Sequence, residues 1–81
     1  MQKEIKVEYF AALRQQAGKR SEVIHTDAKT ARDLFETLRK HYMFSLTEND
    51  TKIAINQQLA SWDCPLNSGD CLLLIPPVAG G

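Results

Sequence analysis

The chain has 81 residues, of which 43% are hydrophobic and 25% are charged, a composition typical of one small globular domain rather than a disordered segment. Ten basic residues balance ten acidic ones, so the formal net charge at pH 7 is zero. This balance excludes the broad positive surface with which proteins bind nucleic acid or anionic membranes, and we expect neither as a partner.

No apolar stretch of signal-peptide or membrane-spanning length occurs, so we expect a cytoplasmic protein. The cysteines, Cys64 and Cys71, have no histidine or third cysteine at metal-ligand spacing. We interpret both as small packing residues and expect no metal site and no disulfide. The isolated histidines, His25 and His41, are likewise interpreted as structural residues without a role in the chemistry.

The first elements follow from local patterns. Residues 4–9 alternate charged and apolar side chains, which predicts a half-buried strand. Residues 11–17 predict a short helix that ends at Gly18, because glycine readily takes the left-handed cap conformation. Residues 21–26 predict a second strand, which we expect to pair with the first as a hairpin.

A longer helix is predicted to begin at Thr30. Threonine is a preferred N-cap, and Asp33, three residues later, is its capping-box partner. Apolar side chains then recur at helical spacing and form one stripe, which consists of Ala31, Leu34, Phe35, Leu38 and Tyr42. Basic residues at positions 39–41 suit the negative end of the helix dipole.

A turn at residues 49–50 is predicted to precede a strand over residues 52–57, with a short return near Gln57 and Gln58. The last strand is predicted over residues 71–75 and is apolar at every position. Such a strand is typical of the centre of a sheet, either covered on both faces or with one face kept for a partner.

Right-handed crossover rules favour a last strand that runs parallel to the first. The order strand, strand, helix, strand, short strand, strand then predicts an α+β fold, a β-grasp with a mixed sheet of about five strands packed on one main helix.

The segment after this strand, residues 76–81, reads Pro-Pro-Val-Ala-Gly-Gly. Pro76 and Pro77 remove two backbone donors and favour an extended path, so the segment reaches roughly 20 Å from the fold. It carries no charged side chain, and its one chemically active group is the carboxylate of Gly81. We therefore expect a domain over residues 1–75 and an extended tail that inserts into a cleft of another protein.

Three segments carry a resemblance to a known family: Val-Glu-Tyr-Phe-Ala-Ala-Leu-Arg at residues 7–14, Ala-Ile-Asn-Gln at residues 54–57, and the end from residue 66. Over essentially the whole chain they look like the small subunit of molybdopterin synthase, which has a ubiquitin-like β-grasp fold. The most specific piece is Pro-Pro-Val-x-Gly-Gly after a Ser-Gly-Asp turn. The family often has aromatic residues at the end of the last strand, whereas this chain has aliphatic ones.

The resemblance implies a sulfur carrier that is not an enzyme by itself. An E1-like adenylyltransferase would use ATP to adenylate Gly81, and a sulfur donor such as a cysteine desulfurase or rhodanese-like protein would supply the sulfur of a thiocarboxylate. The tail, with Gly80 next to the reacting carbon, would enter the large subunit of molybdopterin synthase. Sulfur would pass there to a cyclic pyranopterin phosphate, in a heterotetramer built on a large-subunit dimer, with no cofactor bound by the carrier.

The resemblance also implies a surface that docks the large subunit. The residues assigned to it are Phe10, Arg14, Leu59, Leu73, Ile75, Pro76, Pro77 and Val78. Val78 would anchor the tail in its channel, and Arg14 would form an ion pair with the partner or remain a solvated helical residue. The apolar members are equally consistent with ordinary core packing, because cores and interface anchors share composition.

Two other functions stay open from the sequence. One is a ubiquitin-like modifier joined through Gly81 to lysines of other proteins, although ubiquitin-type tails are often basic before the glycines. The other is a sulfur carrier for another pathway, such as thiamine thiazole synthesis, whose carriers usually lack paired prolines. A stand-alone enzyme is disfavoured, because the sequence has no nucleophile–base constellation, phosphate-binding glycine loop or metal-ligand cluster.

Overall fold

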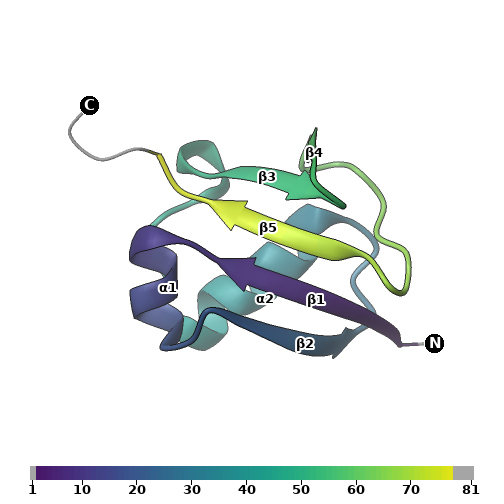
Figure 1. The fold of residues 1–81 in the computed structure, drawn as a ribbon, viewed down its shortest axis with the longest axis horizontal. Coiled ribbons are helices and arrows are strands. Elements are labelled where there is room, and N and C mark those ends of the chain that lie inside the picture. Colours follow the sequence, from purple (N-terminus) through teal and green to yellow (C-terminus); the bar gives the residue numbers. More distant parts are fainter. Residues whose placement is uncertain (1, 78–81) are drawn as a thin grey trace.

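The computed structural model describes residues 2–77. The elements, in chain order, are β1 (Lys3–Tyr9), α1 (Ala11–Ala17), β2 (Ser21–Thr26), α2 (Ala31–Tyr42), the 3₁₀ helix η1 (Glu48–Asp50), β3 (Lys52–Ile55), β4 (Gln58–Ala60) and β5 (Cys71–Ile75). The strands form one sheet in the order β2-β1-β5-β3-β4, and α2 crosses one of its faces (Figure 1). The predicted β-grasp architecture is confirmed.

The last strand lies in the centre of the sheet. β5 runs parallel to β1 and antiparallel to β3, while β1 with β2 and β3 with β4 form antiparallel hairpins. The predicted parallel pairing of the first and last strands and the predicted first hairpin are therefore confirmed. The pairing of β1 with β5 ends where Tyr9 faces Leu74.

The predicted end of α1 and the predicted start of α2 are both present. Gly18 takes a left-handed conformation with φ 76°, and its N–H donates to the carbonyl of Arg14 at 2.9 Å. At the start of α2, the Thr30 hydroxyl accepts from the Asp33 N–H at 3.3 Å, and the Asp33 carboxylate accepts from the Thr30 N–H at 3.4 Å. The capping box is thus confirmed, and it satisfies N–H groups that have no partner inside the helix.

The apolar stripe of α2 packs on the sheet and forms the core. Four of its five predicted members, Ala31, Leu34, Phe35 and Leu38, are buried. They meet the inward-facing residues of the strands, which include Ile5, Val7, Tyr9, Ile53, Leu72 and Leu74. Each large apolar side chain buried in this way contributes about 1.5–3 kcal/mol of transfer free energy.

The turn between β3 and β4 differs from the prediction. β3 ends at Ile55, two residues earlier than expected, and Asn56 and Gln57 form the turn with φ of 53° and 72°. Left-handed conformations at both central positions match the twist of a two-residue hairpin. The Asn56 side chain fixes this position, because its oxygen accepts from the Cys71 N–H and its nitrogen donates to Asp70, both at 3.0 Å.

A carboxylate on β2 joins three elements on the helix side of the sheet. Glu22 accepts hydrogen bonds from the hydroxyl of buried Tyr9, at 2.6 Å, and from the hydroxyl of Tyr42 on α2. The ammonium of Lys19 lies 3.5 Å from the same carboxylate. Burial alone raises the pKa of Glu22, but the hydrogen bonds from Tyr42 and Tyr9 and the charge of Lys19 outweigh it, so the pKa is lowered.

This network predicts a loss of stability in acid. Because the folded pKa of Glu22 is lowered, its contribution is complete above the unfolded pKa of about 4.3 and is lost as pH falls through the folded value. We expect Glu22→Gln to reduce the free energy of unfolding by about 1–3 kcal/mol at pH 7, and this difference to shrink toward pH 3.

Urea unfolding at several pH values measures both quantities. Glu8→Gln is the control, because the only ion pair of Glu8 in the described residues is a long one, to Lys6 at 3.9 Å, and both side chains are partly exposed. A difference between wild type and Glu22→Gln that stays constant from neutral to acid pH would contradict the assignment.

Candidate functional site

One face of the sheet has no helix across it and carries an apolar surface. Side chains alternate along β5, so Leu73 and Ile75 lie on the face opposite to the buried core residues and are partly exposed. Ala54 of β3 pairs with Leu73 on one side and with Leu59 of β4 on the other. Leu59 is 79% exposed. Three of the predicted docking residues therefore share one sheet face, and we call these three, with Phe10, the docking face.

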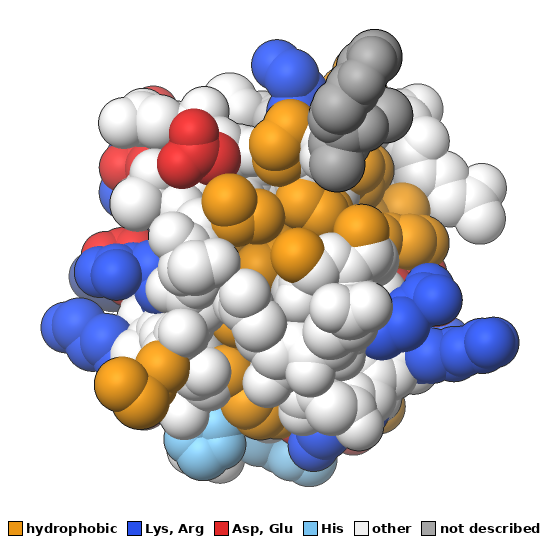
Figure 2. Space-filling view, turned by 90° about the vertical axis from the view of Figure 1, so that its left-hand side faces the viewer, with side chains coloured by type: hydrophobic (Ala, Val, Ile, Leu, Met, Phe, Trp, Pro, Cys, Tyr) orange, Lys and Arg blue, Asp and Glu red, His pale blue; other side chains and the backbone are white. Residues whose placement is uncertain are grey.

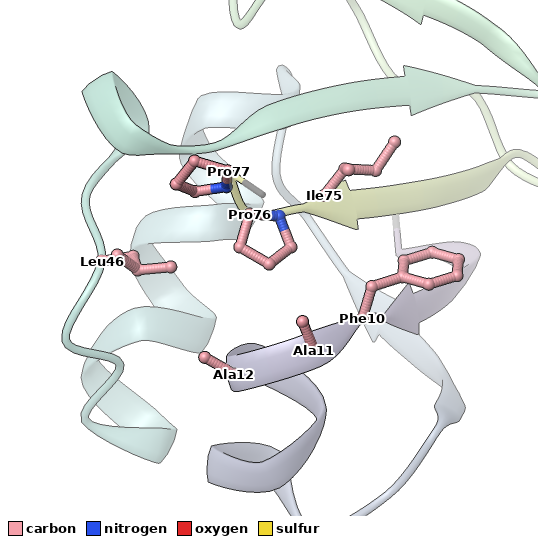
Figure 3. A pocket seen from close by; sticks show the side chains of 7 residues that line it. All are labelled: Phe10, Ala11, Ala12, Leu46, Ile75, Pro76 and Pro77. Carbon is pink, nitrogen blue, oxygen red and sulfur yellow. The ribbon is translucent and has the colours of Figure 1, made fainter. Parts of the chain in front are cut away.

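A pocket lies beside this face, at the point where the chain leaves β5. It has a volume of about 630 Å³ and is lined by Phe10, Ala11, Ala12, Leu46, Ile75, Pro76 and Pro77. Figure 2 shows hydrophobic side chains gathered on this end of the molecule. In Figure 3, Leu46 and Ala12 lie on one side of the prolines, and Phe10 and Ile75 lie on the other. We call this hollow the tail-root pocket.

The structure brings together four predicted site residues in this pocket, Phe10, Ile75, Pro76 and Pro77. Sequence reasoning missed the other three lining residues. Ala11 and Ala12 have small side chains that read only as helix formers. Leu46 is the more informative omission, because it is an apolar residue between Ser45 and Thr47 in a segment without a periodic pattern.

The last described residues show how the tail begins. Pro76 is buried and Pro77 is exposed, so the chain leaves the fold between the two prolines. Proline has no N–H, and Pro76 therefore cannot extend the ladder between β5 and β1. The carbonyl of Phe10 accepts instead from the Leu13 and Arg14 N–H groups at the start of α1. The predicted site residues 78, 80 and 81 (Val78, Gly80 and Gly81) lie outside the described residues.

Arg14 contacts the base of the docking face rather than another charged group. Its Nε donates to the carbonyl of Tyr9 at 3.2 Å, and its guanidinium carbon lies 5.7 Å from the centre of the Phe10 ring. Within residues 2–77, Arg14 forms no ion pair with an acidic side chain. Arg14 thus supports the Phe10 ring through a cation–π contact, and its predicted ion pair with a partner stays a prediction.

Both cysteines are free thiols and partly buried. Burial, followed by the negative charge of Glu8, raises the pKa of the Cys71 thiol. A raised pKa disfavours the thiolate, which is the reactive form of cysteine.

In the stretch from residue 2 to residue 77, no group of three or more His, Cys, Asp or Glu side chains is arranged to hold a metal ion. No helix of this stretch is long and apolar enough to cross a membrane.

Three known proteins are similar to this chain over nearly its whole length. The molybdopterin synthase sulfur carrier subunit of Escherichia coli (strain K12) is 34% identical over 84 residues, which cover 95% of this chain and 99% of that protein. The crystal structure of SAMP1 from Haloferax volcanii is 25% identical with a TM-score of 0.80, covering 96% and 99% of the two chains. A complex of subunits 1 and 2 of molybdopterin-converting factor from Helicobacter pylori 26695 contains a chain that is 25% identical, with a TM-score of 0.67 and coverage of 96% and 99%.

These likenesses extend over nearly the whole chain rather than over one motif. The resemblance drawn from the sequence, to the small subunit of molybdopterin synthase, is confirmed by the Escherichia coli relative. The profile of the ThiS family matches residues 7–81, from within β1 through the Gly-Gly end. The chain therefore belongs to the ThiS family.

Proposed function

We propose that this chain is a sulfur carrier that acts as the small subunit of a molybdopterin synthase. The observation that carries the proposal is the place where the chain leaves the sheet. Pro76 and Pro77, which begin the tail, follow β5 directly and lie between the docking face and the tail-root pocket. A partner that receives the Gly-Gly end meets both apolar surfaces at once. The likeness to a sulfur carrier subunit and to a subunit of a molybdopterin-converting complex supports the same assignment.

The chemistry of this proposal takes place on the carboxylate of Gly81. A carboxylate is a poor electrophile, so an E1-like adenylyltransferase first joins it to the AMP part of ATP and releases pyrophosphate. The outer sulfur of a persulfide on a donor such as a cysteine desulfurase or a rhodanese-like protein then displaces AMP and forms an acyl disulfide. A second thiol cleaves this disulfide, which releases the thiocarboxylate and leaves a disulfide with the donor cysteine. Glycine suits a narrow channel because it has no Cβ, and Gly80 extends this bare end by one residue.

The large subunit is the proposed acceptor of the tail and holds the catalytic pocket. The docking face packs against it, Val78 occupies the channel that leads to the pocket, and the sulfur passes to a cyclic pyranopterin phosphate. An exposed apolar surface on a small domain is a common sign of an interaction site, and central anchors carry most of the binding energy. The complex is a heterotetramer on a large-subunit dimer.

A second candidate function is supported by the likeness to SAMP1, a small archaeal modifier protein. A modifier uses the same adenylated carboxylate, but a lysine amine of another protein displaces AMP and an isopeptide bond forms. Mass spectrometry of the protein from cells separates the two functions. Sulfur in place of one terminal oxygen indicates a carrier. A branched remnant of residues 53–81 on lysines of trypsin-digested proteins indicates a modifier, because Lys52 is the last residue of this chain after which trypsin cleaves.

We expect deletion of Gly81 to abolish sulfur transfer to the precursor by purified activator, sulfur donor and large subunit. The midpoint of thermal unfolding is expected to change little, because the sheet and α2 end before residue 76. Ala79→Ser is the control, since it alters the tail but keeps Gly81 as the terminal residue. Molybdopterin formation by the chain without Gly81 would show that the sulfur-carrier mechanism is wrong.

Truncation of the docking face is expected to weaken binding of the large subunit. Loss of a central anchor costs about 1–4 kcal/mol, so Ile75→Ala or Phe10→Ala should raise the dissociation constant at least several-fold. Val23→Ala is the matched control, because Val23 is 55% exposed on β2, at the far edge of the sheet. Titration calorimetry on folded variants measures the effect, and unchanged affinity for Leu73→Asp would place docking on another surface.

The cysteines are expected to be dispensable for sulfur transfer. In the proposed route the sulfur is bonded to the carboxyl carbon of Gly81, so neither thiol has a step to perform. Cys64→Ser combined with Cys71→Ser should leave the transfer rate unchanged once any loss of stability is corrected for. Complete loss of transfer in a folded double variant would instead indicate a persulfide route through one of these residues.

A further inference from the structure

The wall of the tail-root pocket that lies across from Phe10 comes from the irregular segment between α2 and η1. Leu46 of this segment is partly buried against the core and lines the pocket (Figure 3). Phe44, two residues earlier, is buried and fixes one end of the segment in the core. Leu46 belongs to no helix or strand, so backbone ladders do not determine where its side chain lies.

One side chain of α1 binds this segment from outside. The Gln16 amide nitrogen donates to the hydroxyl of Ser45 at 2.9 Å, and its amide oxygen accepts from the Ser45 N–H at 3.1 Å. Both polar ends of one amide thus hold the residue directly before Leu46. Ala11 and Ala12, at the start of the same helix, line the pocket as well. Gln16 therefore connects the helix beneath the pocket to the segment that forms its wall.

We propose that Gln16 is a positioning residue of the docking surface, which fixes Leu46 as a wall of the tail-root pocket. This inference rests on the proposed function, because it names the pocket as part of the surface that receives the large subunit. Without the Gln16 amide, Ser45 loses two hydrogen bonds that link residues 29 positions apart. The segment is then fixed by the core contacts of Phe44 and Leu46 and, after Leu46, by Glu48, whose carbonyl accepts from Trp62 at 3.0 Å. The partner must then order the segment around Leu46 when it binds, and the conformational entropy lost in this ordering weakens the affinity.

The neighbouring glutamine supplies a matched control. Gln15 and Gln16 follow each other on α1 and are both exposed. Gln15 makes no side-chain hydrogen bond to any part of the chain that the structure describes, whereas Gln16 makes two. Replacing either by alanine changes helix propensity by a similar amount.

The test is titration calorimetry of four variants of the full chain with purified large subunit: Gln16→Ala, Gln15→Ala, Leu46→Ala and the double variant Gln16→Ala with Leu46→Ala. We expect Gln16→Ala to raise the dissociation constant about 3- to 10-fold and Gln15→Ala to leave it unchanged. Because Gln16 acts through Leu46, the double variant should bind no more weakly than Leu46→Ala alone. Sulfur transfer should show a raised KM for the carrier with kcat unchanged.

Two results would overturn the inference while the proposed function stands: equal binding by the Gln16→Ala and Gln15→Ala variants, or additive losses in the double variant. If Gln16→Ala does not fold, Ser45→Ala provides the second measurement, because it removes one hydrogen-bond acceptor and keeps the Ser45 N–H bond. This variant should weaken binding by less than Leu46→Ala does, and unchanged binding would count against the proposal. Failure of the wild-type chain to bind the large subunit would overturn the proposed function and this inference with it.

Discussion

The parallel pairing of β5 with β1 is the contact on which the other features depend. It places the last strand in the centre of the sheet, where Leu72 and Leu74 are fully buried between the sheet and α2. The chain therefore leaves the fold beside the start of α1 rather than at an edge strand. Pro76 ends the ladder there because it has no N–H, and Phe10 is left to line a pocket instead of continuing β1.

The two faces of the sheet differ in how deeply their side chains are buried. The helix side carries the capped helix α2, the apolar core and the hydrogen bonds that Tyr9 and Tyr42 donate to Glu22. The opposite side carries Leu59 and the outward residues of β5, which contribute less burial to the free protein. We therefore expect substitutions on the docking face to reduce the stability of the free domain less than substitutions on the helix side do.

Polar residues of α1 support apolar residues that a partner is proposed to contact. Arg14 lies over the Phe10 ring and binds the carbonyl before it, while Gln16 holds the residue before Leu46. A short helix of seven residues has little core of its own, with only Leu13 and Ala17 buried. Its role in the fold is mainly to shape the end of the sheet where the tail begins.

The sequence by itself determined the features that have local causes. These causes each act over a few residues: the alternation of charged and apolar side chains in the strands, the capping box of Thr30, the cap at Gly18 and the paired prolines. The predicted elements and their β-grasp order followed from them. Tertiary structure alone decided which residues become neighbours across the sheet and around the pocket. Asn56 forms its turn with hydrogen bonds from its side chain to Cys71 and Asp70, and Leu46 lines the pocket next to Ser45, which binds Gln16, 29 residues earlier in the sequence. Such contacts leave no periodic signal, because they depend on where the folded elements meet and not on the pattern of neighbouring residues.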